Sequence, residues 1–208
     1  MVKNKPLLRS TPIKEKVSAK LILKMLEEAE EKNIMLNSIM IIRNGKVITE
    51  GYYKPYSECI ERSMHSATKS FTATAIGLLI DEGRLKLEDT AMSFFPEYAP
   101  ENPCDNLKKM NVWHLLTMTC GHDSVPPRKG TDNYVKQFLN HPVPYVPGTH
   151  FQYSSMASYM LTAIIRKVTG QNMTRYLRTR IFEPLGIYDA YCDTCPMGIE
   201  YGGGGLFL

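Results

Sequence analysis

An Asn-Gly dipeptide, Asn44-Gly45, lies between two segments of strand-forming residues and constrains the fold more than any other feature of the sequence. Both residue types tolerate the left-handed backbone conformation that a two-residue hairpin turn requires. Residues 38–43 and 46–53 on either side are therefore predicted to form two antiparallel strands. Because a single hairpin is only marginally stable in water, we expect further strands to lie beside it.

Helical periodicity dominates most of the remaining sequence. Residues 17–32 place apolar side chains on one side of a predicted helix, namely Leu21, Ile22, Met25, Leu26 and Ala29. Further helices are predicted at residues 112–118, 132–139, 156–168 and 173–181. The predicted class is therefore α+β, with a helical subdomain and one side of an antiparallel sheet.

The composition indicates an ordered globular chain. It has 208 residues, of which 43% are hydrophobic and 22% are charged, so it is long enough for one ordinary core. The net charge of +4 is spread over interleaved lysines and glutamates, as in residues 20–32, and this pattern is typical of a solvated helix face and not of a nucleic-acid-binding stripe. We predict a loose, polar N-terminal arm over residues 1–16 and a partial domain over residues 17–208.

Cysteine usage and hydropathy indicate the compartment. The five cysteines are an odd number, which favours reduced thiols over a disulfide framework. Cys192 and Cys195 have the spacing of a metal-binding pair, but no second close pair accompanies them. We therefore expect no metal and no other cofactor. No apolar run has the length of a signal peptide or a membrane span, so we expect a cytoplasmic protein without membrane contact.

Ser66 and Lys69 are one helical turn apart at the start of a predicted amphipathic helix. Its apolar stripe consists of Phe71, Ala75, Leu78 and Leu79, and Gly83 supplies the stop. Residues at i and i+3 share a helix face, so the Lys69 amine can lie beside the Ser66 hydroxyl. The positive pole of the helix at this end favours negative charge on an attacking oxygen. The alternative is a helix-capping serine followed by an exposed lysine.

A second polar element follows a Pro-Gly turn at residues 147–148. It brings Tyr153, Ser154 and Ser155 to the start of the helix predicted at residues 156–168. A buried tyrosine beside a capping serine is the structural alternative. The histidines have no ligand spacing, and His65 adjoins Ser66 on a different helix face, so it is a poor base for that serine.

Taken together, these elements resemble the serine β-lactamase and penicillin-binding-protein-like hydrolases, especially the class C β-lactamase and esterase branch. Seven short stretches match in family order: residues 44–47, 66–72, 81–85, 87–89, 114–121, 147–155 and 181–186. The resemblance implies a β-lactamase/transpeptidase-like fold. It also implies that Ser66 is the acylated nucleophile, with Lys69 and Tyr153 as proton carriers and Ser155 at a substrate-binding position. The substrate would be a small ester, amide or lactam.

Two departures from the family pattern qualify these expectations. Ser155 stands where the family usually has asparagine, which favours an esterase or small peptidase over a penicillin-hydrolysing enzyme. The Lys-Thr-Gly or His-x-Gly motif of a late strand is absent from the sequence. We therefore expect an N-terminal fragment with weak or no activity alone, which a C-terminal complementing chain or a homo-oligomer would complete through the open sheet edge. The alternative is a non-catalytic, truncated binding or scaffolding protein.

Overall fold

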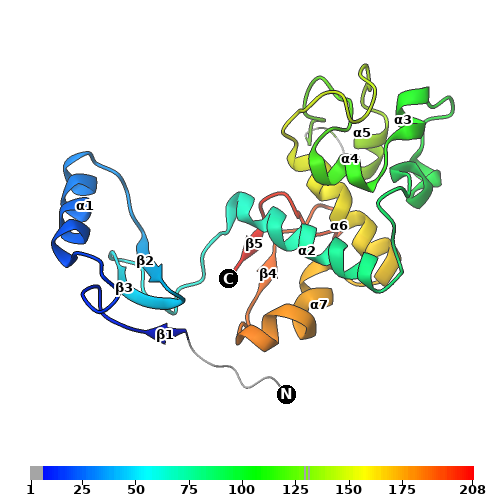
Figure 1. Cartoon of the computed structure of the whole chain (residues 1–208). Coiled ribbons are helices and arrows are strands. Elements are labelled where there is room, and N and C mark those ends of the chain that lie inside the picture. Colours follow the sequence, from blue (N-terminus) through cyan, green and yellow to red (C-terminus); the bar gives the residue numbers. More distant parts are fainter. Residues whose placement is uncertain (1–6, 129, 131) are drawn as a thin grey trace. The chain divides into compact units, whose positions relative to one another are not determined.

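The computed structural model describes residues 7–128, 130 and 132–208. Its contacts divide the chain into two compact units, residues 1–61 and 62–208, and the division falls in the segment between the hairpin and Ser66. Figure 1 shows the elements of both units. Each unit is described by itself.

The first unit contains the predicted hairpin. Strands β2 (Ser38–Arg43) and β3 (Lys46–Tyr52) are antiparallel, and β1 (Leu8–Arg9) pairs with β3 in parallel, which gives the order β1-β3-β2. Asn44 and Gly45 have φ of 51° and 71°, so the turn has the left-handed backbone that the dipeptide predicts. Helix α1 (Ala19–Glu31) completes the unit. Of its predicted apolar side, Ile22 is buried, whereas Leu21 and Met25 are exposed.

The predicted loose arm over residues 1–16 differs from the structure where the structure describes it. Residues 1–6 lie outside the described part, but β1 is hydrogen-bonded to β3. The Glu15 carboxylate accepts hydrogen bonds from Lys46 Nζ at 2.7 Å and Asn44 Nδ2 at 3.0 Å. These bonds lower the pKa of Glu15 to about 2, and the bond from Lys46 has the largest effect. Glu15 and Lys46 are 31 positions apart, so the polar composition of residues 1–16 does not reveal that they pair. The composition therefore predicts a loose arm where the structure has an ordered one.

The second unit is a helical body around one buried helix. Helix α6 (Ser155–Thr169) is buried at every position from Met156 to Ile165, and it packs against α2 (Thr68–Asp81), α4 (Val112–Thr117), α5 (Tyr134–Leu139) and α7 (Met173–Leu177). Shorter elements are the 3₁₀ turns η1 (His65–Ala67), η2 (Ala91–Phe94), η3 (Pro96–Tyr98) and η5 (Glu183–Leu185), α3 (Asp105–Lys109) and the π-helical turn η4 (Arg178–Phe182). Strands β4 (Tyr191–Cys192) and β5 (Leu206–Phe207) form a separate antiparallel pair.

The inner face of α2 is partly polar, unlike the predicted apolar stripe. Ala75 and Leu79 are fully buried as predicted, but so are Thr68 and Thr72. The Thr72 hydroxyl donates to the Gly202 carbonyl at 2.9 Å, so the buried oxygen has a partner. These threonines hold a segment from the far end of the sequence, a role that helical periodicity cannot reveal.

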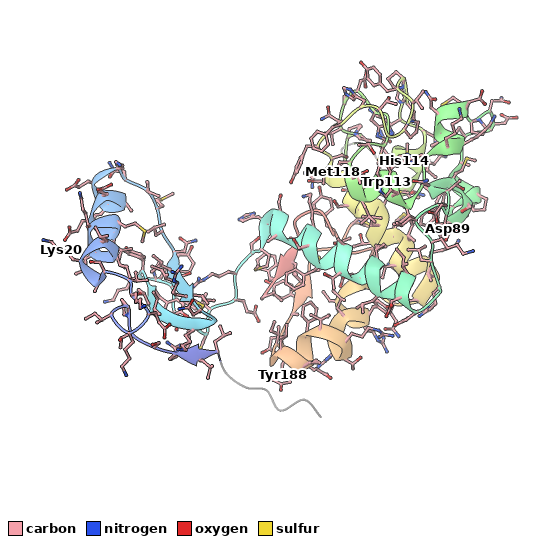
Figure 2. All side chains as sticks on the ribbon, in the orientation of Figure 1. Lys20, Asp89, Trp113, His114, Met118 and Tyr188 are labelled. Carbon is pink, nitrogen blue, oxygen red and sulfur yellow. The ribbon has the colours of Figure 1, made fainter. Side chains whose placement is uncertain are left out.

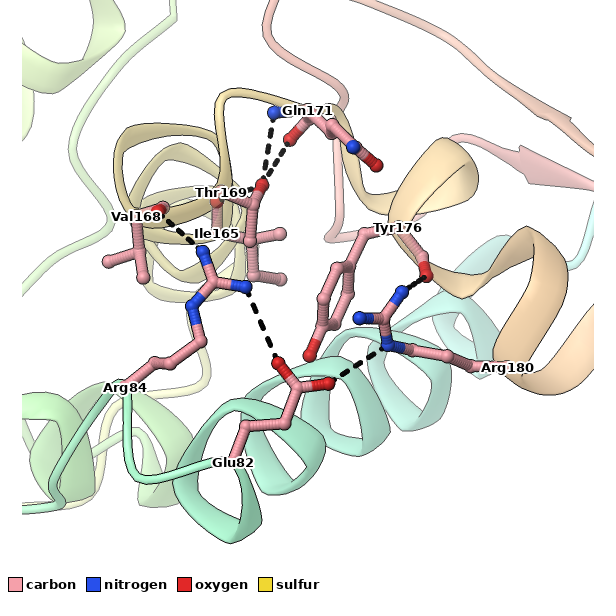
Figure 3. Close-up of polar contacts among 8 residues, drawn as sticks. All are labelled: Glu82, Arg84, Ile165, Val168, Thr169, Gln171, Tyr176 and Arg180. Carbon is pink, nitrogen blue, oxygen red and sulfur yellow. Dashed lines mark hydrogen bonds and ion pairs between the residues drawn. The ribbon is translucent and has the colours of Figure 1, made fainter.

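A charged cluster joins α2 to the helices that follow it (Figure 3). Arg180 Nε and Arg84 Nη1 lie 3.0 and 3.4 Å from the Glu82 carboxylate, and Arg84 Nη2 donates to the Val168 carbonyl at the end of α6. Partial burial raises the pKa of Glu82, but hydrogen bonds, above all from Arg180, outweigh it, and the net pKa is lowered. The cluster therefore ties the C-terminal ends of α2 and α6 to η4.

Glu82→Gln removes the charge and keeps the side-chain shape, so we expect it to lower the free energy of unfolding by about 1 kcal/mol at neutral pH. Because the folded-state pKa of Glu82 is lowered, this contribution is present above the unfolded-state pKa of about 4.3 and is lost as the pH falls through the folded-state value. Urea denaturation from pH 7 to pH 3 measures the effect. Glu88→Gln, at an exposed carboxylate without an ion pair in the described structure, is the matched control. A difference that persists unchanged at low pH would contradict the assignment.

Among the described residues, every helix is too short or too polar to cross a lipid bilayer.

Candidate active site

Ser66 lies in the 3₁₀ turn η1, which leads directly into α2. The preceding residue, His65, has φ of 43°, a left-handed conformation that is uncommon for residues other than glycine. The described hydrogen bonds include none from the Ser66 backbone N–H. A free N–H at the start of a helix is therefore available beside the Ser66 hydroxyl.

Lys69 connects three segments of the chain. Its Nζ lies 3.2 Å from Ser66 Oγ and 3.2 Å from Ser155 Oγ, and it donates to the carbonyl of Gly203. The i, i+3 spacing thus places the amine beside the hydroxyl, as predicted. The contact with Ser155 shows that a serine at this position reaches the lysine although it is shorter than asparagine.

Tyr153 completes the group. Its hydroxyl lies 2.8 Å from Ser66 Oγ, and Lys69 Nζ lies 5.0 Å from the centre of its ring. The side chain is about half exposed, at 49%. The hydrogen bond with Ser66 and the neighbouring Lys69 ammonium both stabilise a phenolate, and they lower the pKa of Tyr153 below its ordinary value. The structure therefore brings together all four residues that the sequence singles out.

Backbone hydrogen bonds between two loops hold Tyr153 in place. Gly148 N donates to the Thr119 carbonyl at 2.8 Å, and Gln152 N donates to the Met118 carbonyl at 3.0 Å. Directly after Tyr153, Ser154 caps α6 by accepting from Ala157 N at 3.2 Å. A capping serine thus stands next to the tyrosine, and the tyrosine itself points out of the core.

Sequence reasoning missed the role of the glycine-rich segment at residues 202–205. A Cβ on Gly203 would lie 2.6 Å from the Ser155 carbonyl oxygen, and one on Gly202 would lie 2.3 Å from Thr162 Cγ2. Only residues without a side chain allow the backbone to approach α6 this closely. This approach brings the Gly203 carbonyl to Lys69. The signal in the sequence is the run of four glycines.

The histidines and cysteines lie outside this group. His114 accepts from Asn111 N at 3.1 Å in the capping box of α4, and its ring meets Trp113 edge-on at 5.3 Å (Figure 2). His122 is buried, and neither ring nitrogen has a hydrogen-bond partner in the described structure. Burial, together with His141, lowers the pKa of His122 to about 4. The five cysteines are free, and no described group of three or more His, Cys, Asp or Glu residues could hold a metal ion.

A hydroxyl, an amine and a phenol thus lie in mutual contact at the start of a helix, with candidate bases beside a candidate nucleophile. A family model described as Beta-lactamase matches residues 29–201, and the chain belongs to this family. It is 32% identical over 164 residues to "Protein flp" of Staphylococcus aureus (strain COL), covering 71% of this chain and 33% of that protein. It is 26% identical over 155 residues to "Esterase EstB" of Burkholderia gladioli, covering 65% of this chain and 39% of that protein.

Solved structures agree with the family assignment. The octameric penicillin-binding protein homologue from Pyrococcus abyssi matches with a TM-score of 0.68 and 24% identity, over 90% of this chain and 52% of that one. The fold is β-lactamase/transpeptidase-like, with helices and a small sheet, as predicted. The chain spans between a third and about half the length of these three proteins.

Tyr153→Phe removes the phenol hydroxyl and keeps the ring, so we expect it to slow labelling of Ser66 by a fluorophosphonate about 100-fold. In the wild type the rate should rise with pH and level off below pH 10, because the pKa of Tyr153 is lowered from about 10. The variant should lose this inflection. Intact-mass spectrometry at successive times and pH values measures both effects, with Tyr145→Phe, whose ring stacks on His150, as the control. An inflection that survives in the variant would show that another group controls it.

Gly203→Ala places a methyl group against the Ser155 backbone, so the glycine-rich segment or the start of α6 must shift, and both contact Lys69. Because small displacements at a reacting centre can cost about 100-fold, we expect labelling of Ser66 to fall at least tenfold. Gly204→Ala is the control, since its Cβ would meet its nearest neighbour, the His65 carbonyl oxygen, at 3.7 Å. Labelling kinetics of both variants, with circular dichroism to check folding, provide the measurement. Equal effects of the two substitutions would count against a positioning role for Gly203.

Proposed function

We propose that this chain carries the nucleophilic half of a serine hydrolase that forms an acyl-enzyme on Ser66. The observation that supports this proposal best is the 2.8 Å contact between Tyr153 OH and Ser66 Oγ, together with Lys69 Nζ at 3.2 Å from the same oxygen. Such contacts meet the first requirement for an activated serine, which is a base within hydrogen-bond reach. Family membership and the name of the related esterase support the same reaction class.

The proposed reaction has two steps. Ser66 Oγ attacks the carbonyl carbon of an ester, amide or lactam, and its proton passes to the Lys69 and Tyr153 pair. The pair returns this proton to the leaving group, and the acyl-enzyme remains. Water then attacks the acyl carbon and gives a proton to the same pair. The pair passes this proton to Ser66 Oγ as the carboxylic acid leaves. Because Lys69 and Tyr153 both lie within hydrogen-bond reach of the Ser66 hydroxyl, we assign the base to the pair and not to either residue.

The start of α2 supports charge stabilisation in both steps. The tetrahedral intermediate carries a negative oxygen, and the unpaired Ser66 N–H near the positive end of the helix is suited to bind it. Family members supply a second donor from a late strand, and loss of one such donor costs on the order of 10²- to 10³-fold in rate. We therefore expect this chain alone to turn over slowly.

Partner contacts are part of the proposal. Strand β2 lies at an edge of the sheet in the first unit, and an edge strand offers unpaired N–H and C=O groups to another strand. We propose that a further segment, or a second copy of the chain, pairs with this edge. Ser155 favours an esterase or a small peptidase. The cytoplasmic location remains a prediction from the sequence.

The test is covalent labelling of Ser66. Incubation with a fluorophosphonate should add one probe mass per chain, located on the peptide that contains Ser66. Ser66→Ala should abolish labelling, whereas Ser70→Ala, at an exposed serine one turn further along α2, should leave it unchanged. Labelling that persists in Ser66→Ala would remove Ser66 from the reaction.

The alternative, a non-catalytic binding or scaffolding protein, makes a different prediction. A folded wild-type chain would then stay unlabelled even after addition of a peptide that bears a Lys-Thr-Gly-like strand. A gain of labelling on addition of that peptide would support the hydrolase and the proposed pairing together.

A further inference from the structure

Arg128 lies in the segment between α4 and α5. Its guanidinium carbon lies 4.7 Å from the centre of the Tyr201 ring, and the side chain is exposed. Arg178 and Arg180, by contrast, each pair with a glutamate. Among the residues that the structure describes, no carboxylate forms an ion pair with Arg128. Its charge and its N–H donors are therefore available to a ligand.

Tyr201 places this cation beside the Ser66 site. The Tyr201 carbonyl accepts hydrogen bonds from Gly204 N at 3.2 Å and Gly205 N at 3.0 Å, so the tyrosine and the glycine-rich segment form one tight turn. A Cβ on Gly204 would lie 4.0 Å from Tyr201 Cε1 and 3.7 Å from the His65 carbonyl oxygen. Gly204 thus lies close both to the Tyr201 ring and to the residue that precedes Ser66.

The same turn carries the Gly203 carbonyl that receives the Lys69 ammonium. Arg128 is therefore connected to the Ser66 site through the Tyr201 ring and the glycine-rich turn. The contact with an aromatic ring favours one position of an otherwise flexible side chain. An arginine held against a ring, with its N–H groups unfilled, matches the two oxygens of a carboxylate.

We propose that Arg128 binds a carboxylate on the substrate, so that the site selects acyl substrates with a negative charge. The inference rests on the proposed function, because it names the substrate class of that same site. The carboxylate belongs either to the acyl group or to the leaving group, and both arrangements use the same guanidinium. Lys69 adds a second positive charge beside the Ser66 hydroxyl. The carboxylates nearest along the chain, Asp123 and Asp132, form no ion pair with Arg128 in the described structure.

Two pairs of esters separate charge from intrinsic reactivity. The first pair is the 4-nitrophenyl monoester of glutaric acid and its neutral methyl ester, which place the charge on the acyl side. The second is 4-carboxyphenyl butyrate and phenyl butyrate, which place it on the leaving group. For each pair, the ratio of Ser66 acylation rates is measured by intact-mass spectrometry. Comparing this ratio between variants cancels the reactivity of the esters themselves.

Arg128→Gln should lower the ratio of charged to neutral ester at least about tenfold in one of the two pairs, because a hydrogen-bonded charge pair is lost. Labelling by a neutral fluorophosphonate should stay unchanged. Arg128→Lys should restore part of the ratio, since lysine keeps the charge but not the two-pronged geometry. Arg178→Gln, at an exposed arginine paired with Glu183, is the matched control and should leave the ratio as it is.

An unchanged ratio in both pairs, or an equal loss for charged and neutral esters, would overturn the proposal. If Ser66 reacts with no ester and no fluorophosphonate, the proposed function fails, and a binding measurement then decides the role of Arg128. Titration with free glutarate should shift the NMR signals of the Gly203 and Gly204 amides in the wild type, and this response should be absent in Arg128→Gln. The same shifts in both proteins would exclude Arg128 as the carboxylate site.

Discussion

The rest of the site depends on the contacts that the Lys69 ammonium makes. It contacts Ser66 Oγ, Ser155 Oγ and the Gly203 carbonyl, and these groups belong to the start of α2, the start of α6 and the glycine-rich segment. A charged amine among three oxygens loses favourable hydrogen bonds if any of the segments moves away. The surrounding polar contacts serve the same end, because Thr72 holds Gly202 and the Glu82 cluster joins the far ends of the helices. Geometry at the serine is thus a property of the whole helical unit.

Local signals predicted the elements and the main residues of the site. The Asn44-Gly45 turn, the helix after Ser66 and the helices α5 and α6 each depend on neighbours in the sequence, and the structure confirms these elements within a few residues. Tyr153 was predicted because a Pro-Gly turn delivers it to a helix start and because the order of motifs resembles a family. Such features are encoded within about ten residues of the group they position.

Features that depend on distant segments could not be read in this way. The buried threonines of α2 look like interruptions of an apolar stripe until Gly202 is seen against them. Glu15 looks like part of a polar arm, although it binds Lys46 across 31 positions. The left-handed backbone of His65 could not be predicted either, because most histidines have negative φ although histidine adopts positive φ more often than most residues. In each case tertiary contacts decide the outcome.

The close approach of residues 202 and 203 to α6 changes how a run of four glycines should be regarded. By composition the tract resembles a flexible linker, and protein engineers would choose such a place to insert a tag, a hinge or a randomised library. Here the missing side chains leave room for another helix, so the run is one of the most sterically restricted stretches of the chain. The low sequence complexity of residues 202–205 therefore reflects close backbone packing and not backbone flexibility.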